Sequence, residues 1–368
     1  YNERNTVRNI AHAQEYIRHY LDGSPIPGIK WEYEMIQQIL PAINVDMLNQ
    51  IAQQLVTDHN LIISFQAPED ENVVLPTEAE AIEMLAAVKN EAIEAPVEEE
   101  IRTTLVENAP KAGKIRKTAY NEILGTTEWT LSNGVRVIVK PTDFKQDEIL
   151  FYATSLGGHS QVKTEDLPSA LLATDVVELA GLADMNATDL QKALTGKRVS
   201  LSPSIGGNSE SLSGSSTVKD LETLLQLNYL YFTAPRRDEE SYQTLMSILE
   251  SQLANRDKNP KVAFNDSIQM MTSNNSERTV IFTKELLEKV SLDKALEVYK
   301  ARFANPADFT FFFVGNVNPE DAAFKAQVCQ WLGGLKANKK KEKVVDHQVR
   351  VPLGKQQNYF TQKMETKT

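Results

Sequence analysis

The stretch Trp129-Thr-Leu-Ser-Asn-Gly-Val-Arg-Val-Ile-Val-Lys140 decides how the rest of this 368-residue sequence is interpreted. Its Asn133-Gly134 pair is the dipeptide that a type I′ hairpin turn favours. Val135, Val137 and Val139 then recur at every second position, which places them on one face of a strand. The stretch therefore predicts a β-hairpin, and we expect a domain to open there.

Strands and helices alternate downstream of this hairpin. The spacing of apolar residues predicts strands at Ile149–Leu156, Val199–Ile205, Glu210–Ser215 and Phe309–Val314, and helices at about 169–179, from Thr217, from Asp238 and over Asp293–Phe303. Thr217-Val-Lys-Asp220 is similar to a capping box for the helix that follows it. This mixture of elements predicts an α+β fold.

The first 66 residues predict three helices followed by a strand. The first helix stops at Gly23, the second ends at Pro41, and Asn44 can cap the third. The apolar run Leu61–Phe65 then predicts a buried strand. We expect its apolar surface to be exposed, or covered by another copy or by the following segment.

Two distant segments suggest an internal repeat. Residues 45–65 and 292–314 each contain a capping acid, an apolar helix, a polar break and an apolar strand. Between them, residues 68–127 hold an acidic helix at Glu78–Asn90 and the polar run Glu94–Glu100, so we expect an interdomain connector there. The chain begins at Tyr1 inside a helical pattern, and 358–364 has the pattern of a starting strand. We therefore expect part of a longer protein, with any targeting peptide upstream.

Composition argues against several classes of function. A net charge of −11 disfavours nucleic acid and anionic membrane surfaces as partners. No run of 18 apolar residues occurs that could span a membrane. The lone Cys329 excludes an internal disulfide and a cysteine-based zinc site, and we expect it to be a buried structural thiol. The basic cluster at 339–343 is interpreted as a solvated loop.

A zinc site on a helix needs two ligands four residues apart, and the five histidines provide no such pair. The nearest approach, His12-Ala-Gln-Glu15-Tyr16, has tyrosine at the second ligand position, so a surface helix is favoured. His159, near Glu165 and Asp166, is a candidate loop ligand, although a plain loop histidine is the favoured interpretation. No serine-nucleophile elbow or phosphate loop occurs. We therefore assign no catalytic, cofactor-binding or metal-binding residue.

Several segments, in order, resemble one peptidase family. The hairpin Trp129–Thr142 is similar to the first hairpin of insulinase/pitrilysin-type (inverzincin) zinc metallopeptidase domains, and Ser155-Leu-Gly-Gly158 to the glycine stretch that ends a strand there. Asp189–Lys197, Tyr231–Asp238 and 309–316 continue the match. Asp22–Ile29 and Leu40–Asn44 resemble the late part of a preceding domain of the same family, most closely in its envelope branch, whose chains hold four such domains.

The resemblance implies a domain plan. Residues 1–67 would be the end of a preceding insulinase-like domain, 68–127 an acidic connector, 128–335 an inactive insulinase-like domain, and 336–368 a linker and the first strand toward the next domain. It implies a mainly antiparallel sheet covered by helices on one face, preceded by a partial copy of the same fold. It also implies a periplasmic or cell-envelope location.

One departure from the family pattern bears on function. Active members carry H-x-x-E-H on the helix that corresponds to Ser169–Gly181, which contains no histidine here. Glu178 lies on that helix, but without ligands it has no zinc-bound water to activate. The resemblance therefore implies a non-catalytic portion of a zinc metalloendopeptidase. This portion would wall the chamber that encloses peptide or small-protein substrates and contact the other domains of the polypeptide. Zinc is expected in the intact protein's first domain.

Two other functions stay open. The chain could be a catalytically dead structural or assembly subunit of the same superfamily. It could also be an unrelated α+β binding module whose matching segments are coincidental. An H-x-x-E-H motif upstream would favour the peptidase, and its absence would favour the scaffold.

Overall fold

The computed structural model describes residues 1–55, 60–67, 73–92, 104–256, 259–338, 340–359 and 361. The chain divides into two compact units, one within residues 1–100 and the other comprising essentially residues 101–368.

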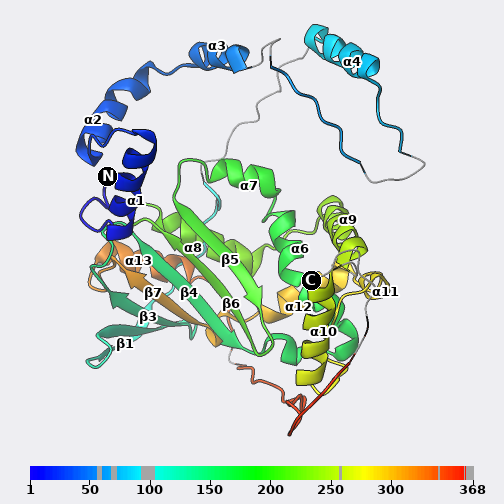
Figure 1. The fold of residues 1–368 in the computed structure, drawn as a ribbon. Helices are drawn as coiled ribbons and strands as arrows, with labels where there is room; N and C mark the ends of the chain where they lie inside the picture. The colour runs from blue at the N-terminus through cyan, green and yellow to red at the C-terminus, as the bar shows by residue number, and fades with distance from the viewer. Residues whose placement is uncertain are drawn as a thin grey trace. The chain divides into compact units, whose positions relative to one another are not determined.

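The first unit is helical in the residues described. Its helices are α1 (Asn9–Asp22), α2 (Ile29–Ile39), the short 3₁₀ helix η1 (Leu40–Ala42), α3 (Val45–Leu55) and α4 (Glu78–Asn90) (Figure 1). Gly23 ends α1 with a φ of +72°, a conformation that glycine adopts without strain. At the start of α3, Asn44 Oδ1 accepts a hydrogen bond from the Met47 N–H at 2.9 Å, as the sequence predicts. The helix predicted at Glu78–Asn90 is confirmed, and Thr77 and Glu80 form a capping box at its start.

The strand predicted at Leu61–Phe65 is wrong, because residues 61–67 adopt no regular structure. A strand needs a neighbour for its backbone hydrogen bonds, and the described part of this unit contains no other strand. The side chains of Leu61, Ile63 and Phe65 are all exposed, which is one of the two outcomes expected for this surface, the other being that another copy or the connector covers it. The internal repeat therefore holds for its helices, α3 and α12 (Leu292–Arg302), each 11 residues long, but not for its strands.

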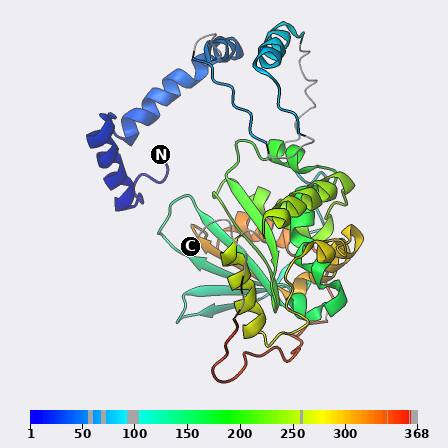
Figure 2. The same cartoon turned by 45° about the vertical axis from the view of Figure 1, so that its right-hand side comes forward.

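The second unit is built on a seven-stranded sheet with the order β1-β2-β3-β7-β4-β6-β5. Its strands are β1 (Ile115–Asn121), β2 (Thr126–Leu131), β3 (Arg136–Pro141), β4 (Ile149–Leu156), β5 (Val199–Ile205), β6 (Ser209–Ser216) and β7 (Thr310–Gly315) (Figures 1 and 2). All neighbouring strands are antiparallel except β3 and β7, which are parallel. The predicted α+β class with a mainly antiparallel sheet is confirmed.

The hairpin of β2 and β3 forms where the sequence predicts it, but its turn is not type I′. That turn requires positive φ at both central residues. Here only Gly134 has one, at +90°, and its N–H donates to the carbonyl of Leu131 at 3.0 Å. The loop has three residues, since Leu131 N–H donates to Val135 C=O at 2.9 Å. The Asn133 side chain donates to the carbonyls of Leu332 and Leu335, so a contact from outside the hairpin selects this turn.

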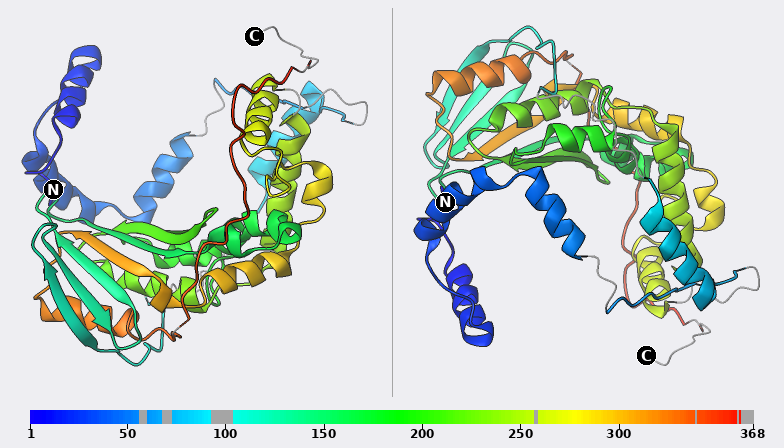
Figure 3. Two further views of the ribbon diagram at one scale, coloured as in Figure 1. Left: turned by 90° about the horizontal axis from the view of Figure 1, so that it is seen from below. Right: turned by 90° about the horizontal axis from the view of Figure 1, so that it is seen from above.

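Two helices cover one face of the sheet and close the core. They are α8 (Leu221–Thr233) and α13 (Ala322–Trp331), side by side in Figure 3. Phe232 of α8 packs edge-on against Phe309 with ring centroids 5.1 Å apart, and Phe324 of α13 packs against Phe313 at 5.4 Å. Burial of these rings supplies much of the drive to fold. The other helices of this unit are η2 (Gly158–Gln161), η3 (Thr164–Asp166), α5 (Leu167–Leu171), α6 (Ala173–Ala180), α7 (Ala187–Ala193), α9 (Glu239–Arg256), α10 (Pro260–Thr272), α11 (Lys284–Leu287), α12 and η4 (Pro306–Asp308).

Two local predictions differ from the structure. The sequence predicts a connector over residues 68–127, yet β1 lies within this range and pairs with β2. As an edge strand with mostly exposed residues on both faces, β1 lacks the alternation that marks a strand in a sequence. The Thr217–Asp220 segment forms a turn before α8, in which Asp220 N–H donates to Thr217 Oγ1 at 3.1 Å. The Thr217 N–H donates to the Arg198 carbonyl at 3.2 Å rather than to the Asp220 carboxylate, so the second hydrogen bond of a capping box does not form.

The face of the sheet away from α8 and α13 carries side chains that solvent reaches. Leu150 and Tyr152 of β4 are exposed there. On the neighbouring strands β5 and β6, serines pair directly across the ladder at Ser200–Ser215, Ser202–Ser213 and Ser204–Ser211. This open face is therefore rich in hydroxyl groups near the edge strand β5.

Candidate functional site

The helix at which the family pattern places its zinc ligands is α5 followed by α6, with a break at Leu172. Most of its inward-facing residues are small or apolar and almost fully buried: Ala170, Ala173, Val176, Val177 and Ala180. These side chains have no nitrogen, oxygen or sulfur atom with which to bind zinc, and the buried Ser169 hydroxyl accepts a hydrogen bond from Ser291 N–H at 3.0 Å. This helix therefore does not fit a zinc ion, and its burial stabilises the core instead.

Two acidic residues lie on α6 without histidine neighbours on the same helix. Burial raises the pKa of Glu178, the nearby Asp175 raises it further, and a hydrogen bond from Ser202 opposes both. Burial likewise raises the pKa of Asp175. An acid with a raised pKa can serve as a general base only next to a substrate or an activated water, and α6 offers no metal ligand to supply one.

His12 and His159, the two histidines considered as candidate metal ligands, do not lie in a group of metal-binding side chains among the described residues. His12 lies on the exposed helix α1, where its Nδ1 is 3.9 Å from the Glu15 carboxylate. His159 donates from Nε2 to the Ala170 carbonyl at 3.3 Å, and burial lowers its pKa. Its acidic neighbours Glu165 and Asp166 pair with lysines. Across the described ranges, no three histidine, cysteine, aspartate or glutamate side chains gather closely enough to hold a metal ion.

Cys329 is half-buried on α13 rather than fully buried as predicted. Burial raises the pKa of its thiol, which keeps it protonated and poorly nucleophilic at neutral pH. Its backbone carbonyl accepts a hydrogen bond from Gly113 N–H at 2.8 Å, so this part of the helix also anchors the chain before β1.

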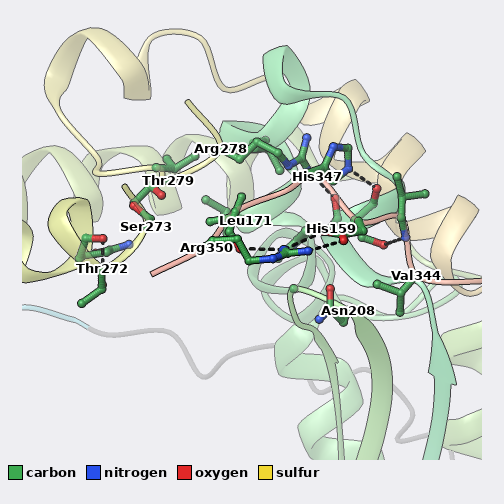
Figure 4. A pocket seen from close by; sticks show the side chains of 18 of the residues that line it. His159, Leu171, Asn208, Thr272, Ser273, Arg278, Thr279, Val344, His347 and Arg350 are labelled. Carbon is green, nitrogen blue, oxygen red and sulfur yellow. Dashed lines mark hydrogen bonds and ion pairs between the residues drawn. The ribbon is translucent and has the colours of Figure 1, made fainter. Parts of the chain in front are cut away.

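A pocket of about 770 Å³ lies in the second unit, at the loop that follows β4. Its walls come from the loop with η2, from the β5–β6 turn, from α10 with the segment after it, and from residues 344–351. Figure 4 shows Thr272 and Ser273 on one side of this pocket and His159, His347 and Val344 on the other. The sequence did not reveal this pocket, because four segments far apart in the chain form it and none carries a recognisable motif.

The glycine stretch after β4 shapes one wall. Gly158 has a φ of +55°, and a Cβ there would lie 2.3 Å from the Gly206 carbonyl, so no other residue fits. Its N–H donates to Glu210 at 2.7 Å. The side chain of Glu210 is only 1% exposed, and burial raises its pKa, although the Gly158 N–H and Arg302 act in the opposite direction.

Residues 342–347 bond to the loop that follows this glycine stretch and form the part of the pocket wall beside it. We call them the strap. Glu342 forms an ion pair with Arg302, Val345 N–H donates to Ser160 Oγ at 3.1 Å, and His347 donates from Nε2 to the Ser160 carbonyl at 2.8 Å. The strap has no regular secondary structure, so these contacts hold its position.

The comparisons with known proteins agree on one family. The sequence is 28% identical over 337 residues to an Arabidopsis thaliana protein described as a zinc protease PQQL-like, covering 91% of this chain and 32% of that protein. It is 24% identical over 210 residues to the probable zinc protease PqqL of Escherichia coli, covering 57% of this chain and 22% of that protein. No family model matches the sequence.

Solved structures give the same fold. The periplasmic protease PqqL from Escherichia coli superposes with a TM-score of 0.61 at 20% identity, covering 94% of this chain and 38% of that one. The ferredoxin protease FusC, solved in complex with Arabidopsis ferredoxin, superposes with a TM-score of 0.57 at 20% identity, covering 92% and 37%.

This chain thus spans about a third of the length of the relatives that it matches over most of its own length. Among the described residues, no helix is long and apolar enough to cross a membrane. The ordered sequence motifs, the mainly antiparallel sheet with helices on one face, and the zinc-protease relatives agree. In sequence and in fold, the chain is similar to zinc metallopeptidases of the insulinase/pitrilysin type.

Proposed function

We propose that this chain is a non-catalytic portion of a zinc-dependent metalloendopeptidase, and that the zinc motif lies elsewhere in the intact protein. The observation that carries the proposal is the buried face of α5 and α6. Alanine and valine occupy that face, and the helix as a whole contains no histidine, whereas an active family domain carries two histidines on it. The relatives are described as zinc proteases and are about three times longer, which leaves room for an active domain outside this chain.

The proposed domain plan follows the two compact units, with one adjustment. Residues 1–67 are the late part of a preceding insulinase-like domain, and residues 336–368 lead toward a following domain. The inactive domain ends near residue 335, but its sheet begins at Ile115, because β1 pairs with β2. The connector is therefore shorter than 68–127, and the division between the units at about residue 101 supports this boundary.

The open sheet face is the surface that we assign to the wall of the substrate chamber. A chamber wall must contact unfolded peptides without trapping them. The paired serines of β5 and β6 give small side chains and scattered hydroxyl groups, which offer weak hydrogen bonds and little apolar area. Leu150 and Tyr152 add apolar contact on the next strand.

The proposed substrates are peptides or small proteins, and the proposed partners within the polypeptide are the other family domains. One solved relative is a protease bound to ferredoxin, which supports small proteins as substrates. Another is a periplasmic protease, which supports a periplasmic or envelope location. The net charge of −11 supports the absence of nucleic acid among the partners.

The full-length protein tests this proposal against the structural-subunit alternative. We expect it to contain an H-x-x-E-H motif before this segment, to hold one zinc ion and to cleave a fluorogenic peptide. Replacing the glutamate of that motif by glutamine should abolish cleavage. Glu178→Gln in this chain should leave kcat within about two-fold of the unmodified protein's value, because substitutions away from a catalytic centre typically change free energies by less than about 0.5 kcal/mol. A full-length protein without the motif and without activity would establish the structural subunit instead.

A further inference from the structure

The pocket beside the strap contains one guanidinium group without a carboxylate partner. Arg278 donates from Nη2 to the His159 carbonyl at 2.7 Å and from Nη1 to Thr164 Oγ1 at 3.1 Å. Within the described residues, no carboxylate pairs with it, and its remaining N–H groups have no acceptor. Burial lowers the pKa of Arg278. An anion that bonds to the remaining N–H groups of Arg278 would offset this partial loss of hydration.

The other ionisable groups in the pocket do not neutralise Arg278. Asp346 pairs with Arg350, which lowers the pKa of the aspartate to about 2, so the two charges cancel each other. His159 donates its Nε2 proton to a backbone carbonyl, and burial keeps its pKa below the usual range. The pocket therefore carries a net positive charge at neutral pH, located on Arg278.

The geometry around Arg278 favours a carboxylate with an apolar body. A guanidinium matches the planar carboxylate with two parallel hydrogen bonds. Leu171, Val280 and Val345 supply an apolar wall in the same pocket. A volume of about 770 Å³ is large for an inorganic anion and falls in the range of sites that hold small organic ligands.

We propose that this pocket binds the C-terminal carboxylate of a peptide that ends in an apolar residue. The peptide carboxylate bonds to Arg278, and its last side chain lies against Leu171 and Val280. The identity of the ligand as a peptide rests on the proposed function. The two fixed contacts of Arg278, to Thr164 and to the His159 carbonyl, hold the guanidinium in place before the ligand arrives.

Binding of a short fluorescein-labelled peptide tests the proposal directly. Two peptides of the same sequence ending in leucine are compared by fluorescence polarisation, one with a free C-terminus and one amidated. The free acid should bind at least about ten-fold more tightly than the amide, because amidation removes at least one charge-assisted hydrogen bond to Arg278. Equal binding of both peptides, or no binding of the free acid at millimolar concentration, would overturn the proposal.

Variants locate the site. Arg278→Gln should weaken binding of the free acid about ten-fold or more. Arg278→Lys keeps the charge but loses the planar fork, so its affinity should lie between those of the unmodified chain and of Arg278→Gln. Thr279→Glu, a neighbouring pocket residue, adds a carboxylate that competes for Arg278 without removing its fixed contacts. Arg116→Gln on the exposed strand β1 is the matched control and should change nothing. If Arg278→Gln folds, judged by its unfolding midpoint, and still binds like the unmodified chain, the assignment is wrong.

Inorganic phosphate separates this site from a general anion site. Phosphate should compete with the peptide only weakly, because it has no apolar body to contact Leu171 and Val280. Competition at the same concentration as the peptide would overturn the assignment to a peptide terminus. The assay measures binding rather than cleavage, so a negative result here leaves the proposed function standing. Zinc-dependent cleavage by this chain would overturn the proposed function without touching the pocket.

Discussion

Helix α3 of the first unit and helix α12 of the second unit allow a comparison of the two regions of this molecule. Both are 11 residues long, both are amphipathic, and both begin at a side-chain cap. Yet α12 buries Leu296 and Tyr299 almost completely, whereas α3 buries no residue and leaves Leu48 and Ile51 exposed. An amphipathic pattern thus determines that a helix forms and which face is apolar, but burial of that face requires a partner surface. The following predictions test this contrast.

The largest effect is expected from truncation of the aromatic core. Phe311→Ala in β7 removes a fully buried ring and should lower the free energy of unfolding by about 3–5 kcal/mol. Ile51→Ala on the exposed face of α3 should change it by less than about 0.5 kcal/mol. Urea denaturation followed by tryptophan fluorescence reports on the core of the second unit through the buried Trp129 and Trp331, and on the first unit through Trp31 of α2. A similar loss in both variants would mean that α3 is as well packed as the sheet domain.

The next effect concerns backbone geometry at the glycine stretch. Gly158→Ala should destabilise the second unit by about 1–3 kcal/mol, since the added methyl group meets the Gly206 carbonyl at a positive φ. Gly207→Ala in the facing turn is the matched control, because a Cβ there has no neighbour within 4 Å. The shift in the thermal unfolding midpoint distinguishes them. Equal midpoints for both variants would show that the two loops can separate without cost.

Much of the sheet domain follows from the sequence because its strands alternate. Ile149–Leu156 and Val199–Ile205 have the predicted bounds, since every second residue faces one buried layer. The edge strand β1 has no such layer on either side and gives no signal. The Asn133 turn departs from type I′ because carbonyls about 200 residues away hold its side chain. The pocket at Arg278 is similarly invisible, because its walls meet only in the folded chain.

Proteolysis gives a third and qualitative contrast. A brief digestion with a nonspecific protease should remove residues before Ile115 and leave a stable fragment that extends to about residue 335. No residue of α1, α2 or α3 is buried, so local unfolding of these helices costs little free energy. Mass spectrometry of the resistant fragment identifies its ends. A first cut inside β1 to β7 would contradict the domain boundary proposed above.

The smallest effect is expected from the two helix caps. Ser291→Ala removes the hydroxyl that accepts from Lys294 N–H at the start of α12, and should cost about 1 kcal/mol in the unfolding of the core. Asn44→Ala removes the corresponding cap of α3. It should reduce the helix content measured by circular dichroism, but it should not move the midpoint of the unfolding transition that the fluorescence of Trp129 and Trp331 reports. If Asn44→Ala shifts that midpoint by as much as Ser291→Ala, the two regions fold as one cooperative unit.

The most direct test of the central claim is the zinc content of this chain, measured together with its peptidase activity. The purified chain is incubated with zinc, dialysed, and analysed by elemental mass spectrometry, and the same sample is assayed with a fluorogenic peptide. The apolar buried face of α5 and α6 predicts far less than one zinc ion per chain and no cleavage above the buffer rate. One tightly bound zinc per chain, with cleavage that a chelator abolishes and zinc restores, would contradict the account.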